Sequence, residues 1–157
     1  MNQPSLQRAT AYTLLALLAL GLSACAPPEP TDEAIQRAIH DMATALEARE
    51  SSALLARLHD DLSAQESRQG SFGKEEARRL LMAVFYRHRD IGVVVTNIQV
   101  TPDAIRDDRA SASFNALVTG GQGGLLPERA QLYRIHSEWQ LDDDWQLIAL
   151  EAKRALE

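Results

Sequence analysis

Residues 133–148 read Tyr-Arg-Ile-His-Ser-Glu-Trp-Gln-Leu-Asp-Asp-Asp-Trp-Gln-Leu-Ile. Every second side chain from Tyr133 to Leu141 faces the same way, which is the two-residue period of a half-buried β-strand. The aspartates of residues 142–144 then form a turn, and Trp145 begins another strand. The stretch therefore predicts an antiparallel hairpin, with Trp139 and Trp145 in the core.

Two earlier segments have strand character as well. Residues 91–100 are rich in β-branched side chains, and residues 109–119 alternate apolar side chains with serine and asparagine. A glycine-rich crossing at residues 120–124 leads to the strand that begins at Ala130. Short connections between consecutive strands favour an antiparallel meander.

Amphipathic helices are predicted before the strands. The first begins at Thr31 and buries one stripe with helical spacing, formed by Ile35, Ile39, Met42 and Leu46. The second begins at Ser51 or Ser52 and buries Leu54, Leu55, Leu58 and Leu62. Residues 65–71 have no apolar period and are predicted to be a loop.

A third helix begins near Gly73. Its predicted buried face carries Ala77, Leu80, Leu81, Val84 and Phe85, and its outer face carries Lys74, Arg78, Arg79 and Arg87. The predicted fold class is α+β, with three N-terminal helices packed on a curved antiparallel sheet of three to four strands.

The hairpin and the segment Leu54-Leu55-Ala56-Arg57-Leu58-His59-Asp60-Asp61 make residues 31–157 resemble the nuclear transport factor 2-like superfamily. The resemblance implies a cystatin-like cone, in which the sheet curls around the helices and leaves a pocket. The superfamily contains isomerases, cyclases, carriers and dimerisation modules, so the fold does not decide the function.

The chemistry that the resemblance implies is incomplete in this chain. In the isomerase members a carboxylate base follows the second helix, which corresponds to a position near Glu66. The tyrosine that assists it is missing, because no tyrosine lies between Ala26 and Phe85. We therefore predict no catalytic residues.

The histidines do not indicate a metal or cofactor site. His40, His59, His88 and His136 are each expected to be solvated or satisfied by a neighbour. A site at residues 59–61 is excluded because consecutive side chains on a helix point about 100° apart. One cysteine in the chain excludes a disulfide framework. No metal and no cofactor are predicted.

The first 24 residues have the pattern of a secretory signal. Arg8 is their only charged side chain, and the apolar run of residues 11–22 forms a helix of about 18 Å, which is too short to cross a bilayer. The segment Leu22-Ser23-Ala24-Cys25 resembles the lipobox of bacterial lipoproteins. The resemblance implies cleavage before Cys25 and attachment of diacylglyceryl and palmitate-type chains to that residue. The alternatives are an ordinary signal peptide whose cysteine is incidental, or an uncleaved anchor.

Residues 25–30 then form a lipidated cysteine with a proline-rich spacer. The residue after the cysteine is Ala26 rather than aspartate, so the resemblance favours the outer membrane, facing the periplasm, over the inner membrane. With 16 basic and 22 acidic residues, the chain has no overall electrostatic attraction for nucleic acid.

The chain has one basic cluster, formed by Arg78, Arg79, Arg87, His88 and Arg89. We interpret it as a solvated helix face, and a docking patch for an acidic partner or anionic lipid is the alternative.

These observations lead to one functional hypothesis and two alternatives. The leading hypothesis is a lipid-anchored envelope lipoprotein whose periplasmic domain is not catalytic and binds a protein partner or a small apolar ligand. The first alternative is a small pocket enzyme of the isomerase or cyclase type. The second is a module that forms a homodimer through the outer face of its sheet.

Overall fold

A computed structural model describes residues 30–66, 70–121 and 130–155. The predicted signal segment, Cys25 and most of the spacer lie outside these residues. The elements follow the order α2 (Thr31–Glu47), α3 (Ser51–Ala56), β1 (Leu58–Glu66), β2 (Gly70–Phe72), α4 (Lys74–Arg87), β3 (Asp90–Pro102), β4 (Arg109–Gly121), β5 (Ala130–Leu141) and β6 (Trp145–Arg154). None of the described helices is long and apolar enough to cross a bilayer.

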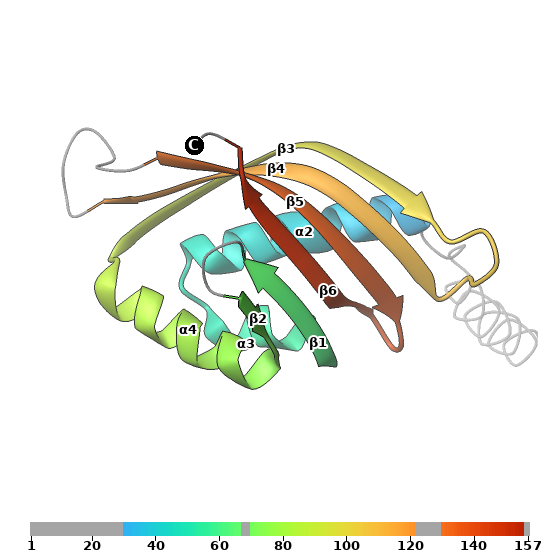
Figure 1. Cartoon of the computed structure of the whole chain (residues 1–157), viewed down its shortest axis with the longest axis horizontal. Coiled ribbons are helices and arrows are strands. Elements are labelled where there is room, and N and C mark those ends of the chain that lie inside the picture. Colours follow the sequence, from blue (N-terminus) through green and yellow to red (C-terminus); the bar gives the residue numbers. More distant parts are fainter. Residues whose placement is uncertain (1–29, 67–69, 122–129, 156–157) are drawn as a thin grey trace, which may run out of the picture.

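The sheet has six strands in the order β2-β1-β6-β5-β4-β3. It curves around α2, which lies across its concave face, while α3 and α4 pack below one end (Figure 1). The antiparallel pairing of β3 through β6 confirms the predicted meander. The predicted strand count of three to four is wrong, because β1 and β2 extend the sheet beyond β6.

The predicted second helix is too long. It ends at Ala56, and Leu58 and Leu62 belong to β1, which pairs with β6 in parallel. The backbone N–H of Leu147 donates to the carbonyl of Arg57 at 2.8 Å. The chain therefore pairs with the free edge of β6 directly after the helix ends. The spacing of the leucines fits a helix, but their burial with Ala64 follows the strand.

The predicted loop of residues 65–71 is also partly wrong. Gln65 and Glu66 end β1, and Gly70 begins the short strand β2, which pairs with them. The described residues of this stretch therefore form the edge of the sheet rather than an irregular connection.

The main core lies between α2 and the concave face of the sheet. Trp139 is 1% exposed and Trp145 is also buried, which confirms their predicted place in the core. Ser137 is a buried polar residue beside them. Its hydroxyl donates to the carbonyl of Ala112 at 3.1 Å and accepts from the indole N–H of Trp139 at 3.0 Å, so both buried groups are satisfied.

Candidate functional site

A cavity of about 160 Å³, which we call the chamber, lies between the helices and the concave face of β3 to β6. Its lining is apolar except for Ser137 and Trp139, whose polar atoms already bond to each other or to the backbone. The helices contribute Ile39, Met42, Ala43, Leu46 and Leu54, and the sheet contributes Val93, Val95, Phe114, Ala116, Val118, Ile135, Leu147 and Leu150. An apolar cavity of about 150 Å³ is large enough to bind benzene. The chamber therefore has room for one small apolar ring.

A second hollow of about 480 Å³, which we call the mouth, adjoins the chamber at Val118, since this side chain lines both. The mouth lies between the end of α4 and the ends of the central strands. Its lining is more polar: Val84, His88, Ile91, Val118, Thr119, Gly120, Gln131 and Tyr133. Groups that can carry a proton are therefore found beside the chamber rather than inside it.

His88 is the first residue after α4, and its backbone N–H donates to the carbonyl of Val84 at 2.8 Å. Its imidazole lies against Gly120 of β4. A Cβ atom on Gly120 would be 3.3 Å from Nδ1 of His88, which is tighter than ordinary packing. Glycine at this position thus lets the histidine lie close to the strand.

Tyr133 enters the mouth from β5, on the same side of the strand as Ile135 in the chamber. Across the sheet its partner is Arg154 of β6. The Nε atom of Arg154 is buried and has no hydrogen-bond partner among the described residues. Because side chains alternate along β5, Tyr133 lies in the mouth, and the neighbouring strand β6 carries Arg154 beside it.

The apolar side chains that could bind a ring and the side chains that could move a proton lie in different hollows. The described lining of the chamber contains no acid or base, so it can hold a ring but cannot move a proton. The mouth supplies an imidazole and a phenol, which are both common acid–base groups in enzymes. Val118 lines both hollows and so marks where the chamber meets these groups.

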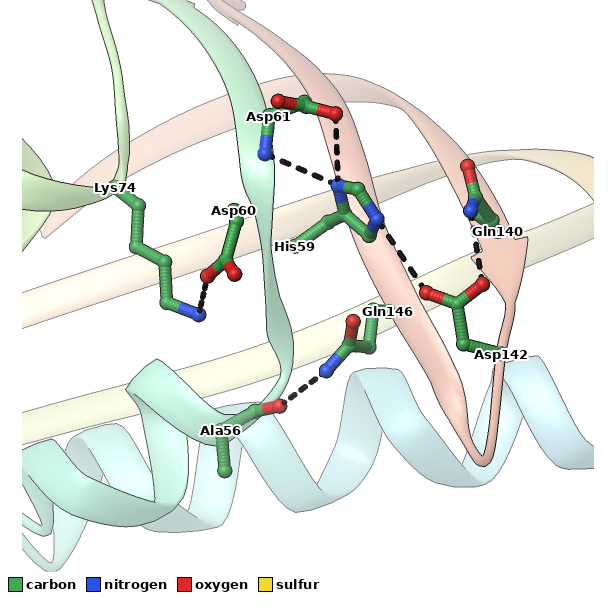
Figure 2. A network of polar contacts seen from close by, with 8 residues as sticks. All are labelled: Ala56, His59, Asp60, Asp61, Lys74, Gln140, Asp142 and Gln146. Carbon is green, nitrogen blue, oxygen red and sulfur yellow. Dashed lines mark hydrogen bonds and ion pairs between the residues drawn. The ribbon is translucent and has the colours of Figure 1, made fainter.

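His59 belongs to a separate polar network at the edge of the sheet (Figure 2). Its Nδ1 accepts from the backbone N–H of Asp61 at 3.0 Å, and its Nε2 lies 3.4 Å from the carboxylate of Asp142. Gln140 donates to the other oxygen of Asp142 at 2.9 Å. The network joins β1 to the turn between β5 and β6 and satisfies His59. Residues 59–61 lie in a strand, so the argument from helical spacing against a metal site there is wrong.

Two further polar contacts nearby tie strands of the sheet to the helices. Lys74 of α4 bonds to Asp60 at 2.7 Å, and Gln146 of β6 donates to the carbonyl of Ala56 at 3.1 Å (Figure 2). The bond from Lys74 holds the pKa of Asp60 below its ordinary value of 3.8. Asp60 and Asp61 are exposed, and the described residues contain no group of histidine, cysteine and acidic side chains that could hold a metal ion.

The remaining predicted residues lie apart from the chamber. His40 is exposed on α2, and His136 is exposed on the outer face of β5, where its Nδ1 lies 3.2 Å from the hydroxyl of Ser113. Glu66, the base position implied by the isomerases, ends β1, but its side chain lies outside what the structure describes.

His88 and Tyr133 are candidate site residues that were not predicted from the sequence. His88 was assigned to a solvated basic face because it follows Arg87 and precedes Arg89. The available signal was the alternation of β5, which puts Tyr133 on the same face as Trp139. Nothing in the sequence brings His88 to that face, because the contact with Gly120 depends on how α4 packs.

No protein-family model matches the sequence, and no curated protein matches it either. Solved structures do match. A provisionally assigned scytalone dehydratase from Novosphingobium aromaticivorans has a TM-score of 0.70 and 16% identity, covering 79% of this chain and 83% of that one. An NTF2-like protein from Cytophaga hutchinsonii has a TM-score of 0.64 and 20% identity, covering 80% and 99%. The chain has the nuclear transport factor 2-like fold.

A hexachlorocyclohexane dehydrochlorinase from Novosphingobium barchaimii shares this fold, with a TM-score of 0.63 and 21% identity over 78% of this chain and 85% of that one. At such identity the likeness shows the nuclear transport factor 2-like fold alone. The enzymes among these structures nevertheless run against the leading hypothesis that the domain is not catalytic. They favour the alternative, a small pocket enzyme.

Proposed function

We propose that the chain is a small pocket enzyme that moves a proton on a compact, mainly apolar substrate containing about one ring. The observation that carries the proposal is the apolar chamber of about 160 Å³, whose own polar groups are satisfied, next to a mouth lined by His88 and Tyr133. A largely apolar pocket with a few convergent polar groups is the usual form of a small-molecule site.

The reaction class that fits best is elimination. The ring lies in the chamber with its reacting edge at Val118. His88 takes a proton from a carbon of the ring, the C–H electron pair becomes a C=C bond, and the bond to a neighbouring hydroxyl breaks. Tyr133 gives its proton to the departing oxygen, which leaves as water, and the proton on His88 then returns to Tyr133 through solvent. Substrate thus becomes an alkene and water without a co-reactant.

Isomerisation uses the same first step. His88 takes a proton from one carbon and returns it to another, while Tyr133 donates a hydrogen bond to the carbonyl oxygen on which negative charge develops. The names of two similar structures favour elimination, since one is provisionally a dehydratase and the other removes hydrogen chloride from a chlorinated cyclohexane. Both names describe loss of a small molecule across a new double bond.

One assay tests both forms of the proposal. Dehydration of β-hydroxycyclohexanone and isomerisation of β,γ-cyclohexenone give the same conjugated ketone, which is followed by its ultraviolet absorbance. We expect the protein to accelerate at least one reaction, and His88→Gln to lower the rate by about 10²–10⁴-fold. His136→Gln, on the outer face of β5, should leave the rate unchanged. The proposal fails if neither reaction proceeds faster with the protein than with His88→Gln.

We also propose that the enzyme is tethered through lipid on Cys25 to a bacterial outer membrane, facing the periplasm. The support is the short apolar run of residues 11–22 and the Leu-Ser-Ala-Cys segment that ends at Cys25. We expect the chain to fractionate with membranes when expressed in a bacterium, and Cys25→Ala to abolish acyl incorporation. Mass spectrometry that finds the thiol of the native product unmodified would contradict the tether.

A further inference from the structure

We propose that the outward face of α4, formed by Arg78, Arg79, Met82 and Tyr86, docks on the surface of an anionic lipid bilayer. This face is distinct from the mouth. Residues spaced three or four apart share one side of a helix, and these four follow that spacing. The opposite side of α4 buries Ala77 and Phe85.

Two large apolar side chains on this face are unusually exposed. Tyr86 is 90% exposed and Met82 is 65% exposed, one helical turn apart. Exposed apolar side chains that gather on one helix face commonly mark an interaction surface. Tyrosine in particular favours the headgroup level of a membrane, where its ring is shielded and its hydroxyl remains in water.

The apolar pair lies among exposed arginines, two of which are paired with exposed glutamates of the same helix. Arg79 lies 3.8 Å from Glu76 and Arg78 lies 3.6 Å from Glu75, and both are exposed pairs of the kind that contribute little. Arg87 and Arg89 follow at the end of the helix and are exposed as well. This surface has four exposed arginines, at residues 78, 79, 87 and 89, against three exposed acids, at residues 75, 76 and 90. A chain of net charge −6 thus has a locally basic surface, and guanidinium groups bind lipid phosphates through paired hydrogen bonds.

The shape of the face favours a bilayer over an acidic protein. A specific protein interface buries about 800 Å² on each partner around a core that is poor in charge. This face has only one pair of neighbouring apolar side chains, with arginines around it. A fluid headgroup layer accepts such a pattern because it closes around each side chain and needs no complementary shape.

Co-sedimentation of the full chain with vesicles tests the proposal. The protein is made with Cys25→Ala so that no acyl chain is attached, and the vesicles contain phosphatidylglycerol or phosphatidylcholine alone. Two double variants are compared with wild type. One combines Met82→Ser and Tyr86→Ser, and the other combines Arg78→Gln and Arg79→Gln. The control is Val94→Ser with Arg134→Gln, which makes the same kinds of change at exposed positions of the sheet. All variants keep residues 1–30, so any binding by the N-terminal segment is common to them.

We expect binding to phosphatidylglycerol vesicles to fall about tenfold or more in each α4 variant and to stay unchanged in the control. Wild-type binding should also weaken as salt is added and should be weak on phosphatidylcholine. Equal binding by wild type and both α4 variants would overturn the proposal. Loss in the arginine variant without loss in the Met82 and Tyr86 variant would overturn it as well, since the surface would then be purely electrostatic and would suit an acidic protein.

Discussion

Trp139 is the largest fully buried side chain of the core, and its indole N–H is held by Ser137. Truncation to alanine removes the indole from the main core and leaves a larger void next to the chamber. We expect Trp139→Ala to lower the free energy of unfolding by about 3–5 kcal/mol in a denaturant titration. Leu141→Ala, at an exposed position of the same strand, should cost less than about 1 kcal/mol. A similar loss for both would mean that Trp139 does not pack as described.

The contact between Asp60 and Lys74 makes the free energy of unfolding depend on pH in the acid range. Because Lys74 lowers the pKa of Asp60 in the folded state, this contact contributes fully above the ordinary value of 3.8 and is lost as the pH falls through the lower folded value. We expect wild type to lose more stability than Lys74→Met as the pH is lowered below about 4. The measurement is the free energy of unfolding as a function of pH.

Asp60→Asn is the matched partner for that comparison. It should flatten the same part of the curve, and Lys74→Met should have little further effect in the Asp60→Asn background. If the free energy of unfolding fell equally with pH below about 4 in wild type and Lys74→Met, the role given to the Asp60–Lys74 contact would be contradicted.

Single residues of the core could be predicted from the sequence better than single residues of the site. Trp139 was placed correctly because the alternation in residues 130–141 is regular. His88 was not, since its role depends on the close approach of α4 to Gly120, and such a contact between distant segments has no local pattern. The hydrogen bond that makes Ser137 acceptable in the core also depends on the backbone of a neighbouring strand.

At the scale of elements, the pairing of β3 with β4 depends on Gly92. A Cβ atom there would lie 2.6 Å from the hydroxyl oxygen of Thr119, its partner across the strands, and a β-branched side chain cannot easily move aside. We expect Gly92→Ala to destabilise the fold by roughly 1–3 kcal/mol. Adding Thr119→Ala should recover much of that loss, as measured in a double-mutant cycle. Additive losses would show that the clash is not the cause.

The element predictions succeeded where structure is local. The helix at residues 31–47 and the strands from β3 to β6 each have a clear period, and short connections set their antiparallel order. The strand β1 was missed because its partner β6 lies far along the chain, and its leucines at residues 58 and 62 continue a helical spacing. A bulge between Leu58 and Ser63 further hides the two-residue alternation.

At the scale of the whole molecule, the curved sheet and α2 line a half-open chamber that should bind one apolar ring. We expect benzene to raise the melting temperature of wild type. Ala116→Leu fills the chamber from β4 and should abolish this rise, because Ala116 is one of its lining residues. Leu117→Met, which points to the opposite face of the same strand, serves as the control. An equal rise in Ala116→Leu would place the ligand elsewhere.

The exchange of ring hydrogens for deuterium tests proton abstraction at the mouth most directly. Cyclohexanone in heavy water is followed by NMR, and loss of the signal from the carbons next to the carbonyl reports each proton removed, without any need for a leaving group. We expect wild type to accelerate this exchange, and His88→Gln and Ala116→Leu each to abolish the acceleration. Exchange at the buffer rate with wild type, or at the wild-type rate with His88→Gln, would contradict this expectation.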